Sequence, residues 1–341
     1  MISSSAKSPI ACLDEARIQS LVTMDDAVEL MEMVFAADAK KLIKTFPVVQ
    51  DFIPPHQGSF VIKGGYIEIR DSGTKDGVTR ILGLKAGSYW PCNLSAGLPN
   101  HNAAMMMFNA LTGRPTAILG ANTITALRTA AGGAVAARHL APTGRVKVAM
   151  LGAGEQAHVQ LEALRLVREI DEVRVWSRTL SNAERFSLEW REKGVEVRSM
   201  VDAETAVRGA DIIVTTTPSR SPIVQSDWVK SGTHINAIGS DAVGKAELAP
   251  DLVLRARLIA DKRAQSVTIG EMQSVLAKGL ADESHISAEL GEICAGLEPG
   301  RMDSDTVTIF DSSGVSFQDL IMADYLVRKA QETALVGTIE L

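Results

Sequence analysis

Apolar residues in segment 146–178 are spaced as in one strand–helix–strand unit. The run Val-Lys-Val-Ala-Met-Leu at 146–151 is rich in aliphatic and β-branched residues, which indicates a buried strand. A Gly-Ala-Gly turn follows, and apolar residues then recur with helical spacing, at Ala157, Leu161, Leu164 and Val167. Another apolar run at 173–176 predicts the next strand. The segment therefore has about the 30 residues expected of a βαβ unit.

Strand and helix patterns continue to alternate after this unit. The predicted elements are a helix at 203–209 and strands at 195–200, 211–218, 233–239 and 257–261. Such alternation predicts an α/β fold with a parallel, right-handed, doubly wound sheet. The last segment, 306–331, contains a strand, a Ser-Ser-Gly turn and a long helix, and it does not continue the repeat. We therefore expect it to return to the first domain.

The residues before position 126 have a different pattern. Helical periodicity covers 14–44, and Thr23 is the expected N-cap of the second helix there. From 46 to 119, short apolar runs alternate with turn residues, which predicts an antiparallel sheet. The turn signals lie at 54–55, 64–65, 71–77, 97–100 and 109–113. A helix rich in glycine and alanine follows at 123–138.

Composition narrows the class of protein. A chain of 341 residues exceeds the size that one core usually serves, so we expect two domains. The net charge of −6 and the lack of Lys/Arg runs argue against a nucleic-acid partner. No apolar run approaches a membrane span, and the N-terminus lacks the order of a secretory signal, so a cytoplasmic protein is expected. Cys12, Cys92 and Cys294 are scattered, which favours reduced thiols over disulfides or a metal site.

The glycine turn predicts an anion site. Gly152, Gly154, Glu155 and Gln156 lie where a strand passes into a helix, and the unpaired N–H groups of a helix N-terminus attract pyrophosphate. The plainer alternative is a tight turn without a ligand. In doubly wound sheets ligands lie beyond the carboxyl ends of the strands. This rule adds four further candidates, Thr216, Thr217, Gly239 and Ser240.

The end of the second strand bears on the choice of cofactor. Enzymes that use NAD usually have an acid there for the ribose 2′-hydroxyl, whereas a nearby arginine accommodates a 2′-phosphate. This chain has Ser177, Arg178 and Thr179 and no acid. We therefore expect NADP(H) to be favoured, with NAD(H) as the alternative.

Three polar residues lie in otherwise apolar or glycine-rich surroundings. Arg128 interrupts the small-residue helix, where a lone arginine is usually solvated or salt-bridged. Asp241 follows a predicted strand and could face the cofactor or simply cap a turn. His234 lies inside an apolar strand, so a hydrogen-bonded core histidine is expected there rather than a catalyst.

Several motifs, in order, resemble the ornithine cyclodeaminase and mu-crystallin family. They are Leu-Gly-Leu-Lys at 82–85, Thr-Ala-Leu-Arg-Thr at 125–129, the glycine turn, the segment from 233 to 248, and 307–319. The resemblance implies a homodimer in which a Rossmann-type dinucleotide domain, 126–305, is inserted in a substrate-binding and dimerisation domain, 1–125 and 306–341. It also implies hydride exchange between a nicotinamide and the α-carbon of an amino or imino acid.

The same resemblance implies roles for individual residues. Lys85 and Arg128 would bind the substrate carboxylate, and Asp241 would handle the proton at nitrogen. The motifs also add Thr129, Ser313 and Gly314 to the expected cofactor site.

The sequence departs from the family pattern in the first domain. Many members have an arginine after the second helix, where this chain has Gln50, which cannot clamp a carboxylate as an arginine does. Lys63 replaces an apolar residue and could supply the missing cation. We hypothesise a substrate with a second carboxylate, as in iminosuccinate; the alternative is that Lys63 is an ordinary exposed strand lysine.

The expected function is an NAD(P)H-dependent reductase of a small α-imino acid, of the ketimine, pyrroline-2-carboxylate or iminosuccinate type. In reverse it would act as an amino-acid dehydrogenase. One alternative is a cyclodeaminase, a lyase that uses NAD catalytically. Another is a non-enzymatic binding protein similar to mu-crystallin.

Overall fold

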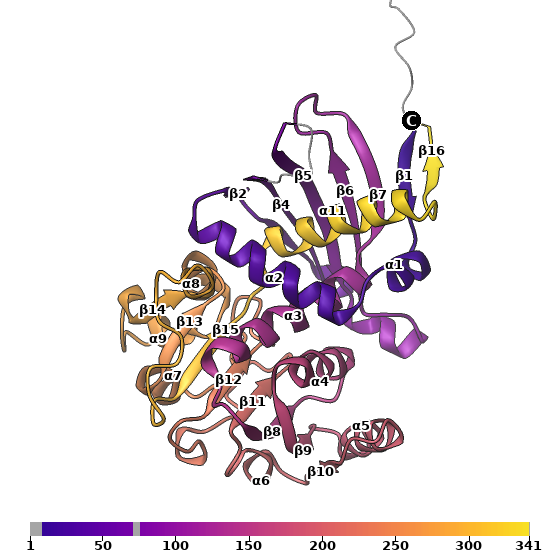
Figure 1. Cartoon of the computed structure of the whole chain (residues 1–341). Helices are drawn as coiled ribbons and strands as arrows, with labels where there is room; N and C mark the ends of the chain where they lie inside the picture. Colours follow the sequence, from indigo (N-terminus) through magenta and orange to yellow (C-terminus); the bar gives the residue numbers. More distant parts are fainter. Residues whose placement is uncertain (1–8, 71–75, 341) are drawn as a thin grey trace, which may run out of the picture. The chain divides into compact units, whose positions relative to one another are not determined.

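The computed structural model describes residues 9–70 and 76–340, which form two compact units (Figure 1). Among the described residues, unit 1 comprises 9–30, 40–70, 76–128 and 315–340, and unit 2 comprises Met31–Ala39 and Thr129–Gly314. Two helices, α2 (Met24–Ala39) and α3 (Asn122–Leu140), contribute residues to both units. The predicted turn at 71–77 lies mostly outside the described residues.

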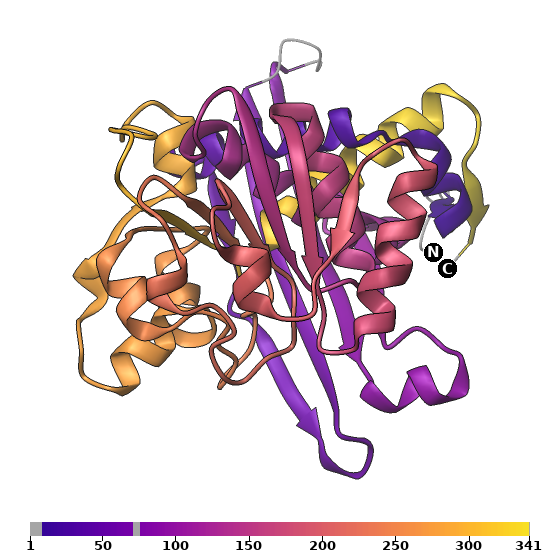
Figure 2. The same ribbon diagram turned by 90° about the horizontal axis from the view of Figure 1, so that it is seen from below.

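Unit 1 is built on one mixed sheet with the strand order β16-β1-β7-β6-β5-β4-β2, and β3 also pairs with β4. All described pairs are antiparallel except β1 with β7. Because β1 pairs with β16, the first and last described strands lie side by side (Figure 2). The strands are β1 (Ile10–Leu13), β2 (Ile43–Thr45), β3 (Val49–Ile53), β4 (Gly58–Arg70), β5 (Val78–Tyr89), β6 (His101–Phe108), β7 (Pro115–Gly120) and β16 (Gly337–Ile339). The further helices of this unit are α1 (Glu15–Leu21), α11 (Ser316–Glu332), η1 (Pro54–His56) and η2 (Pro91–Ala96).

The predicted antiparallel sheet is confirmed, but the turn expected at 64–65 is wrong. Gly64 and Gly65 lie inside the long strand β4, because the sheet there is covered closely by α11. A Cβ on Gly65 would lie 3.1 Å from the Ser316 hydroxyl, and one on Gly83 of β5 would lie 2.9 Å from the Leu320 side chain. The glycines therefore make room for a helix rather than for a reversal of the chain.

Unit 2 is built on one parallel sheet with the strand order β10-β9-β8-β11-β12-β15-β13-β14, so the predicted doubly wound sheet is confirmed. The strands are β8 (Arg145–Leu151), β9 (Glu169–Trp176), β10 (Val197–Ser199), β11 (Ile212–Thr215), β12 (His234–Ala237), β13 (Arg257–Ala260), β14 (Ile286–Glu289) and β15 (Thr308–Asp311). The helices are α4 (Glu155–Val167), α5 (Leu180–Glu192), α6 (Ala203–Val207), α7 (Pro250–Arg255), α8 (Arg263–Ile269), α9 (Met272–Ala277), α10 (Leu290–Cys294), η3 (Ser226–Trp228) and η4 (Glu283–His285).

Alternate residues of the central strands enter two different cores. Val148 and Met150 pack with α4 and α5, whereas Ala149 and Leu151 pack with α6, α7 and α9. Both faces of the sheet are therefore covered, which explains the uninterrupted apolar runs in the sequence.

One predicted assignment is wrong. The strand within 306–320 was expected in the first domain, but β15 pairs with β12 and β13 in the parallel sheet. Only the helix that follows, α11, belongs to unit 1. An apolar strand carries no local signal of which neighbour it pairs with, so this assignment depends on the tertiary fold.

No helix in the described part of the chain is long and apolar enough to cross a membrane. The thiols of Cys12, Cys92 and Cys294 are free.

Candidate active site

The glycine turn of unit 2 joins three neighbouring strands. The N–H of Gly152 donates to the Trp176 carbonyl, and the N–H of Thr216 donates to the Leu151 carbonyl, both at 2.9 Å. Gly152 has φ +119°, and a Cβ there would lie 2.3 Å from Thr216 Oγ1. Only glycine can therefore occupy this turn without displacing the end of β11.

The start of α4 has the properties of an anion site. Gly154 is the N-cap of α4, and no side chain forms a capping hydrogen bond there. A Cβ placed on Gly154 would have no other atom within 4 Å, so the space beside it is open. The first N–H groups of a helix have no partners within the helix, so they can bind an anion that approaches over Gly154. Beside them, Gln156 Oε1 is buried without a hydrogen-bond partner. These features fit the pyrophosphate of a dinucleotide; Glu155 lies in the same turn and is exposed.

At the end of β9, Ser177 is half-buried, and Arg178 and Thr179 are exposed. Thr179 is the N-cap of α5, but its side chain forms no capping hydrogen bond. Arg178 has no ion-pair partner among the described residues. Two hydroxyls and a guanidinium are thus available at the position that contacts the ribose in dinucleotide-binding sheets.

The loops after β11 and β12 are tied to one carboxylate, that of Glu247. It accepts hydrogen bonds from Thr217 N–H and Thr217 Oγ1–H, each at 2.6 Å, and from Gly239 N–H at 2.8 Å. The hydroxyl of Ser240 donates to the Lys245 carbonyl at 3.2 Å. The sequence analysis did not identify Glu247. It lies within the family motif at 233–248, but the neighbouring residues in the sequence do not indicate that its side chain is buried.

The other expected cofactor residues have partners within unit 2. The N–H groups of Ser313 and Gly314 donate to Asp261 Oδ2, at 2.8 and 2.6 Å, which fixes the turn after β15. The carbonyl of Thr129 accepts from Gln160 Nε2 at 3.1 Å. These contacts hold the turn and the helix in place.

Unit 1 contains a buried cluster of two cations and one carboxylate. Lys85 of β5 donates from Nζ to Asp319 Oδ1 at 2.7 Å and to Thr125 Oγ1 at 3.1 Å. Arg128 of α3 donates from Nε to the same Asp319 oxygen at 3.1 Å. Its Nη1 donates to Gln318 Oε1 at 3.3 Å. Lys85 and Arg128 are only 4% and 7% exposed, so the structure brings together the two cations that the sequence suggested.

Local contacts place these side chains. The first N–H groups of α3, at Asn122 and Thr123, donate to the Glu15 carboxylate, at 2.9 and 3.0 Å. This cap fixes the start of the helix that carries Thr125 and Arg128. Asp319 lies in the first turn of α11, where an acid also favours the positive end of the helix.

The electrostatics of the cluster favour an anionic ligand. Burial lowers the pKa of Lys85 to about 7, and repulsion by Arg128 and Lys63 adds to this, against the attraction of Asp319. Burial alone would raise the pKa of Asp319, but Lys85 and Arg128 hold it below its usual value. One carboxylate therefore faces more than one positive charge.

Buried atoms without partners lie on the first turn of α11. Gln318 Nε2 and Asp319 Oδ2 are buried and have no hydrogen-bond partner. Each such atom costs about 1–3 kcal/mol unless something satisfies it. A spare donor and a spare acceptor beside two cations suit a small ligand that carries a carboxylate and a nitrogen. Asp319 was quoted within the motif at 307–319, but its pairing with residues far away in the chain could not be inferred.

The model of the ornithine cyclodeaminase/mu-crystallin family matches residues 11–334. The chain belongs to this family. The expected resemblance is thus confirmed over nearly the whole sequence.

Similar proteins include reductases, dehydrogenases and cyclodeaminases. The iminosuccinate reductase of Paracoccus denitrificans is 39% identical over 327 residues, 96% of this chain and 98% of that protein. Its structure in complex with NAD+ has a TM-score of 0.87 at 38% identity, covering 98% of this chain and 100% of that one. An archaeal alanine dehydrogenase dimer with bound NAD has a TM-score of 0.91 at 33% identity, with the same coverage. The Δ1-pyrroline-2-carboxylate reductase of Thermococcus litoralis, in complex with NADH and L-proline, has a TM-score of 0.90 at 29% identity, covering 97% and 100%.

Gln50 and Lys63, for which the sequence predicted a role in substrate choice, lie on neighbouring strands. Lys63 of β4 is the direct cross-strand partner of Lys85, so the two side chains point to the same face of the sheet. Lys63 is half-buried, and its charge contributes to the lowered pKa of Lys85. Gln50 of β3 is exposed and pairs with Val61.

Asp241, to which the family resemblance assigned the proton, belongs to unit 2 and is exposed. Its Oδ1 accepts from Lys245 Nζ at 2.5 Å. The structure thus groups Lys85 with Arg128 in unit 1 and places Asp241 in a surface ion pair of unit 2. The prediction for His234 is confirmed: it is fully buried and bonds Thr308 and Asn236, each at 2.9 Å, and burial lowers its pKa to about 3.

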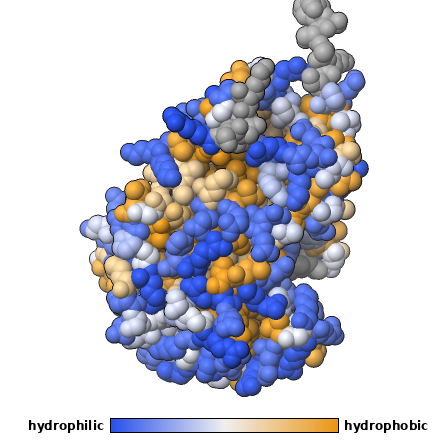
Figure 3. Space-filling view, viewed as in Figure 1, coloured by the Kyte–Doolittle hydropathy of each residue, from blue (hydrophilic) through white to orange (hydrophobic). Residues whose placement is uncertain are grey.

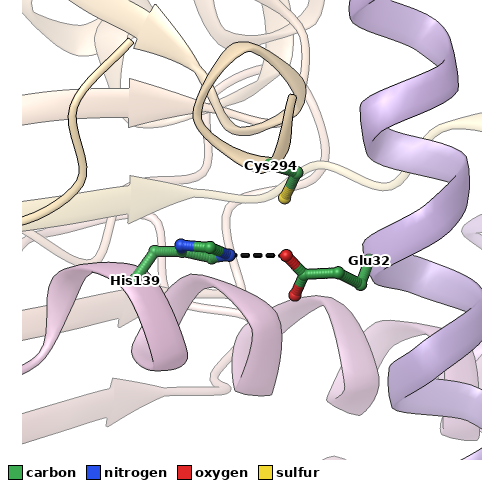
Figure 4. A group of neighbouring side chains, drawn as sticks. All are labelled: Glu32, His139 and Cys294. Carbon is green, nitrogen blue, oxygen red and sulfur yellow. Dashed lines mark hydrogen bonds and ion pairs between the residues drawn. The ribbon is translucent and has the colours of Figure 1, made fainter. Parts of the chain in front are cut away.

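One group in the described residues has the donor types of a metal site: Glu32, His139 and Cys294 offer ligand atoms within 4.8 Å of one another (Figure 4). The Glu32 carboxylate is engaged by His139 Nε2 at 2.6 Å and by Arg138 Nη1 at 3.2 Å. Burial and the nearby Glu32 raise the pKa of the Cys294 thiol well above its usual value, so the thiolate that a metal needs is disfavoured. We interpret this group as a hydrogen-bonded polar cluster, since the adjacent Arg138 would also repel a cation.

Proposed function

We propose that this chain is an NAD(P)H-dependent reductase of a small α-imino acid, reversible as an amino-acid dehydrogenase. The observation that carries the proposal is the Lys85–Asp319–Arg128 cluster of unit 1, in a chain whose unit 2 has a glycine turn before α4 on a parallel sheet. Support comes from the named relatives, which are reductases and a dehydrogenase of imino and amino acids.

In this proposal each residue of the cluster has one task. Arg128, held by Asp319 and Gln318, binds the α-carboxylate. Lys85, with a pKa of about 7, donates a proton to the substrate nitrogen during reduction and accepts it during oxidation. Gln318 Nε2 and Asp319 Oδ2 contact the substrate carboxylate and nitrogen. A bound dinucleotide supplies the hydride to the C=N carbon. Asp241 is kept as a candidate for stabilising the iminium nitrogen.

Two finer features of the proposal rest on single residues. Arg178 supports NADP(H) over NAD(H), although relatives of known structure are described with NAD or NADH. Lys63 beside Lys85 supports a substrate with a second carboxylate, of the iminosuccinate type. Mutants at both residues test these features separately.

We further propose that the protein is a homodimer through unit 1. Large apolar side chains are exposed on β3, on β4 and in the segment before β3, at Phe46, Val48, Val49, Phe52 and Phe60. Val49 and Asp51 of β3 pair with Ile62 and Phe60 of β4, so Val49 and Phe60 point to the same face of the sheet, whereas Phe52 points to the other face. Figure 3 shows hydrophobic residues gathered among hydrophilic ones on the upper part of the face in view. An apolar surface of this kind fits a second copy of the chain, and one relative is described as a dimer.

The test is a screen that follows the absorbance of the reduced nicotinamide. NADPH and NADH are each offered with pyruvate plus amines, with cyclic imines, and with oxaloacetate plus ammonia, while ornithine conversion is followed separately. Oxidation of the cofactor with an imino acid is the expected result. Conversion of ornithine without net change in the cofactor would contradict the proposal and indicate the lyase. Light scattering in solution tests the dimer.

A further inference from the structure

Three fully buried carboxylates of unit 2, those of Asp311, Glu271 and Glu247, are linked in series. Each of the first two accepts a hydrogen bond from the backbone N–H of the next residue in the series. Asp311 at the end of β15 accepts the N–H of Glu271 at 3.0 Å. Glu271 accepts the N–H of Glu247 at 2.8 Å and that of Leu248 at 3.2 Å. Glu247 in turn accepts from the loops after β11 and β12. The end of β15 is thus linked, through three carboxylates, to the ends of two further strands of the sheet.

Glu247 has four donors on its two oxygens. Thr215 Oγ1–H and Gly239 N–H donate to Oε2, at 2.6 and 2.8 Å. Thr217 N–H and Thr217 Oγ1–H donate to Oε1, each at 2.6 Å. The fit is close, because a Cβ on Gly239 would lie 2.6 Å from the Glu247 carboxyl carbon and 2.2 Å from the Thr217 carbonyl. The carboxylate therefore fixes both loops to each other.

The two loops lie where the second half of a dinucleotide is expected. The strand order runs β9-β8 to one side of the glycine turn and β11-β12 to the other. In a doubly wound sheet the dinucleotide crosses the carboxyl ends at this change of direction. If the ribose contacts Ser177 and Arg178 after β9, this rule would place the nicotinamide half over β11 and β12.

We propose that Glu247 is a positioning residue, which holds the loops at Thr216–Thr217 and Gly239–Ser240 in the arrangement that receives the nicotinamide half of the dinucleotide, and that Glu271 and Asp311 hold Glu247 in turn. The inference rests on the proposed function only in requiring that unit 2 binds a dinucleotide.

The arrangement is unfavourable for the carboxylates themselves, which argues against a purely structural role. Burial raises the pKa of Glu247, Glu271 and Asp311, and the charge of Glu247 raises that of Glu271 further. If these positions only had to fill space, apolar residues would do so with a smaller desolvation penalty. A carboxylate is needed where several N–H and hydroxyl donors from separate loops must be satisfied at one point.

The test compares Glu247→Gln with Asp211→Asn as a matched control. Asp211 also accepts a backbone N–H, that of Lys147, at 2.8 Å, but it precedes β11 at the opposite end of the sheet. An amide at position 247 can accept at its oxygen only, so two of the four donors lose their acceptor. We expect the Kd for NADPH or NADH, measured by fluorescence, to rise about tenfold in Glu247→Gln. Amide hydrogen exchange of residues 215–219 and 239–248 should also accelerate. Asp211→Asn should leave the Kd unchanged.

If Glu247→Gln does not fold, Thr215→Val removes a single donor while keeping the shape, and a smaller rise in Kd is expected. An unchanged Kd and unchanged exchange in a folded variant would overturn the inference. Absence of dinucleotide binding by the unmodified protein would instead overturn the proposed function, so the two failures are distinguishable. Steady-state kinetics and primary isotope effects with deuterated cofactor provide a further readout. A displaced nicotinamide should slow hydride transfer, so kcat should fall more than the KM for the imine changes.

Discussion

A single oxygen of Asp319, Oδ1, accepts hydrogen bonds from both Lys85 Nζ, at 2.7 Å, and Arg128 Nε, at 3.1 Å. The other oxygen of this carboxylate is buried without a partner. Asp319 thus holds two cations at a fixed separation and still has an acceptor to offer to a ligand.

We expect Asp319→Asn to reduce kcat/KM for imine reduction by about a hundredfold, because removing a buried partner of two cations typically costs about 3–5 kcal/mol, part of which appears as lost binding. The loss of the negative charge should also lower the pKa of Lys85 further, which shifts the pH profile to lower pH. Glu332→Gln at the exposed end of the same helix is the control. A pH profile identical to that of the unmodified enzyme would show that Asp319 does not act through Lys85.

The pH dependence should have opposite signs in the two directions. Reduction needs Lys85 protonated, so its kcat/KM should fall as pH rises through about 7, the pKa of Lys85. Oxidation of the amino acid needs Lys85 neutral, so its kcat/KM should rise through the same pH. The measurement is kcat/KM against pH in both directions for the enzyme and for Lys85→Met. Profiles that stay flat through this pH would exclude Lys85 as the proton donor.

Arg178 should decide between the two dinucleotides. Arg178→Ala removes the cation available to a 2′-phosphate, so we expect kcat/KM with NADPH to fall about tenfold or more while that with NADH changes little. Arg185→Ala, an exposed arginine on α5, is the control. Higher efficiency of the unmodified enzyme with NADH would contradict the preference for NADP(H).

Lys63 should affect only substrates with two carboxylates. In Lys63→Ala we expect kcat/KM for a dicarboxylic imine, formed from oxaloacetate and ammonia, to fall about tenfold or more, since a charged hydrogen bond is lost. A monocarboxylic imine should be affected much less, and Lys44→Ala on β2 should affect neither. Unchanged kinetics of Lys63→Ala on every active substrate would remove the second-carboxylate hypothesis.

The two glycines of the turn should respond differently to alanine. Gly152→Ala places a Cβ against Thr216 at a positive φ, so it should destabilise the protein by about 1–3 kcal/mol, seen as a lower Tm. At Gly154 a Cβ meets nothing within 4 Å, so Gly154→Ala should keep the Tm and weaken dinucleotide binding by obstructing the approach of the pyrophosphate. Wild-type affinity in Gly154→Ala would argue against an anion at this helix start.

Local patterns in the sequence were sufficient for the main architecture. Apolar runs with strand and helix periods predicted the parallel sheet and the glycine turn, and Thr23 indeed caps α2 by accepting the Asp26 N–H at 3.2 Å. These features could be predicted because strand and helix periodicity and helix capping each involve residues only a few positions apart in the sequence. The family motifs then identified Lys85 and Arg128 as candidates.

Only the tertiary structure decided the partners of these residues. Asp319 meets Lys85 across 234 positions of the chain, and Glu247 gathers donors from two separate loops. The pairing of β15 and the close cover of Gly65 by α11 likewise depend on which elements pack together. A sequence shows which residues are apolar or charged, but a buried charge is stable only beside partners that packing supplies. The sequence alone therefore determined the sheet and its glycine turn, and the fold decided how the buried charges are held.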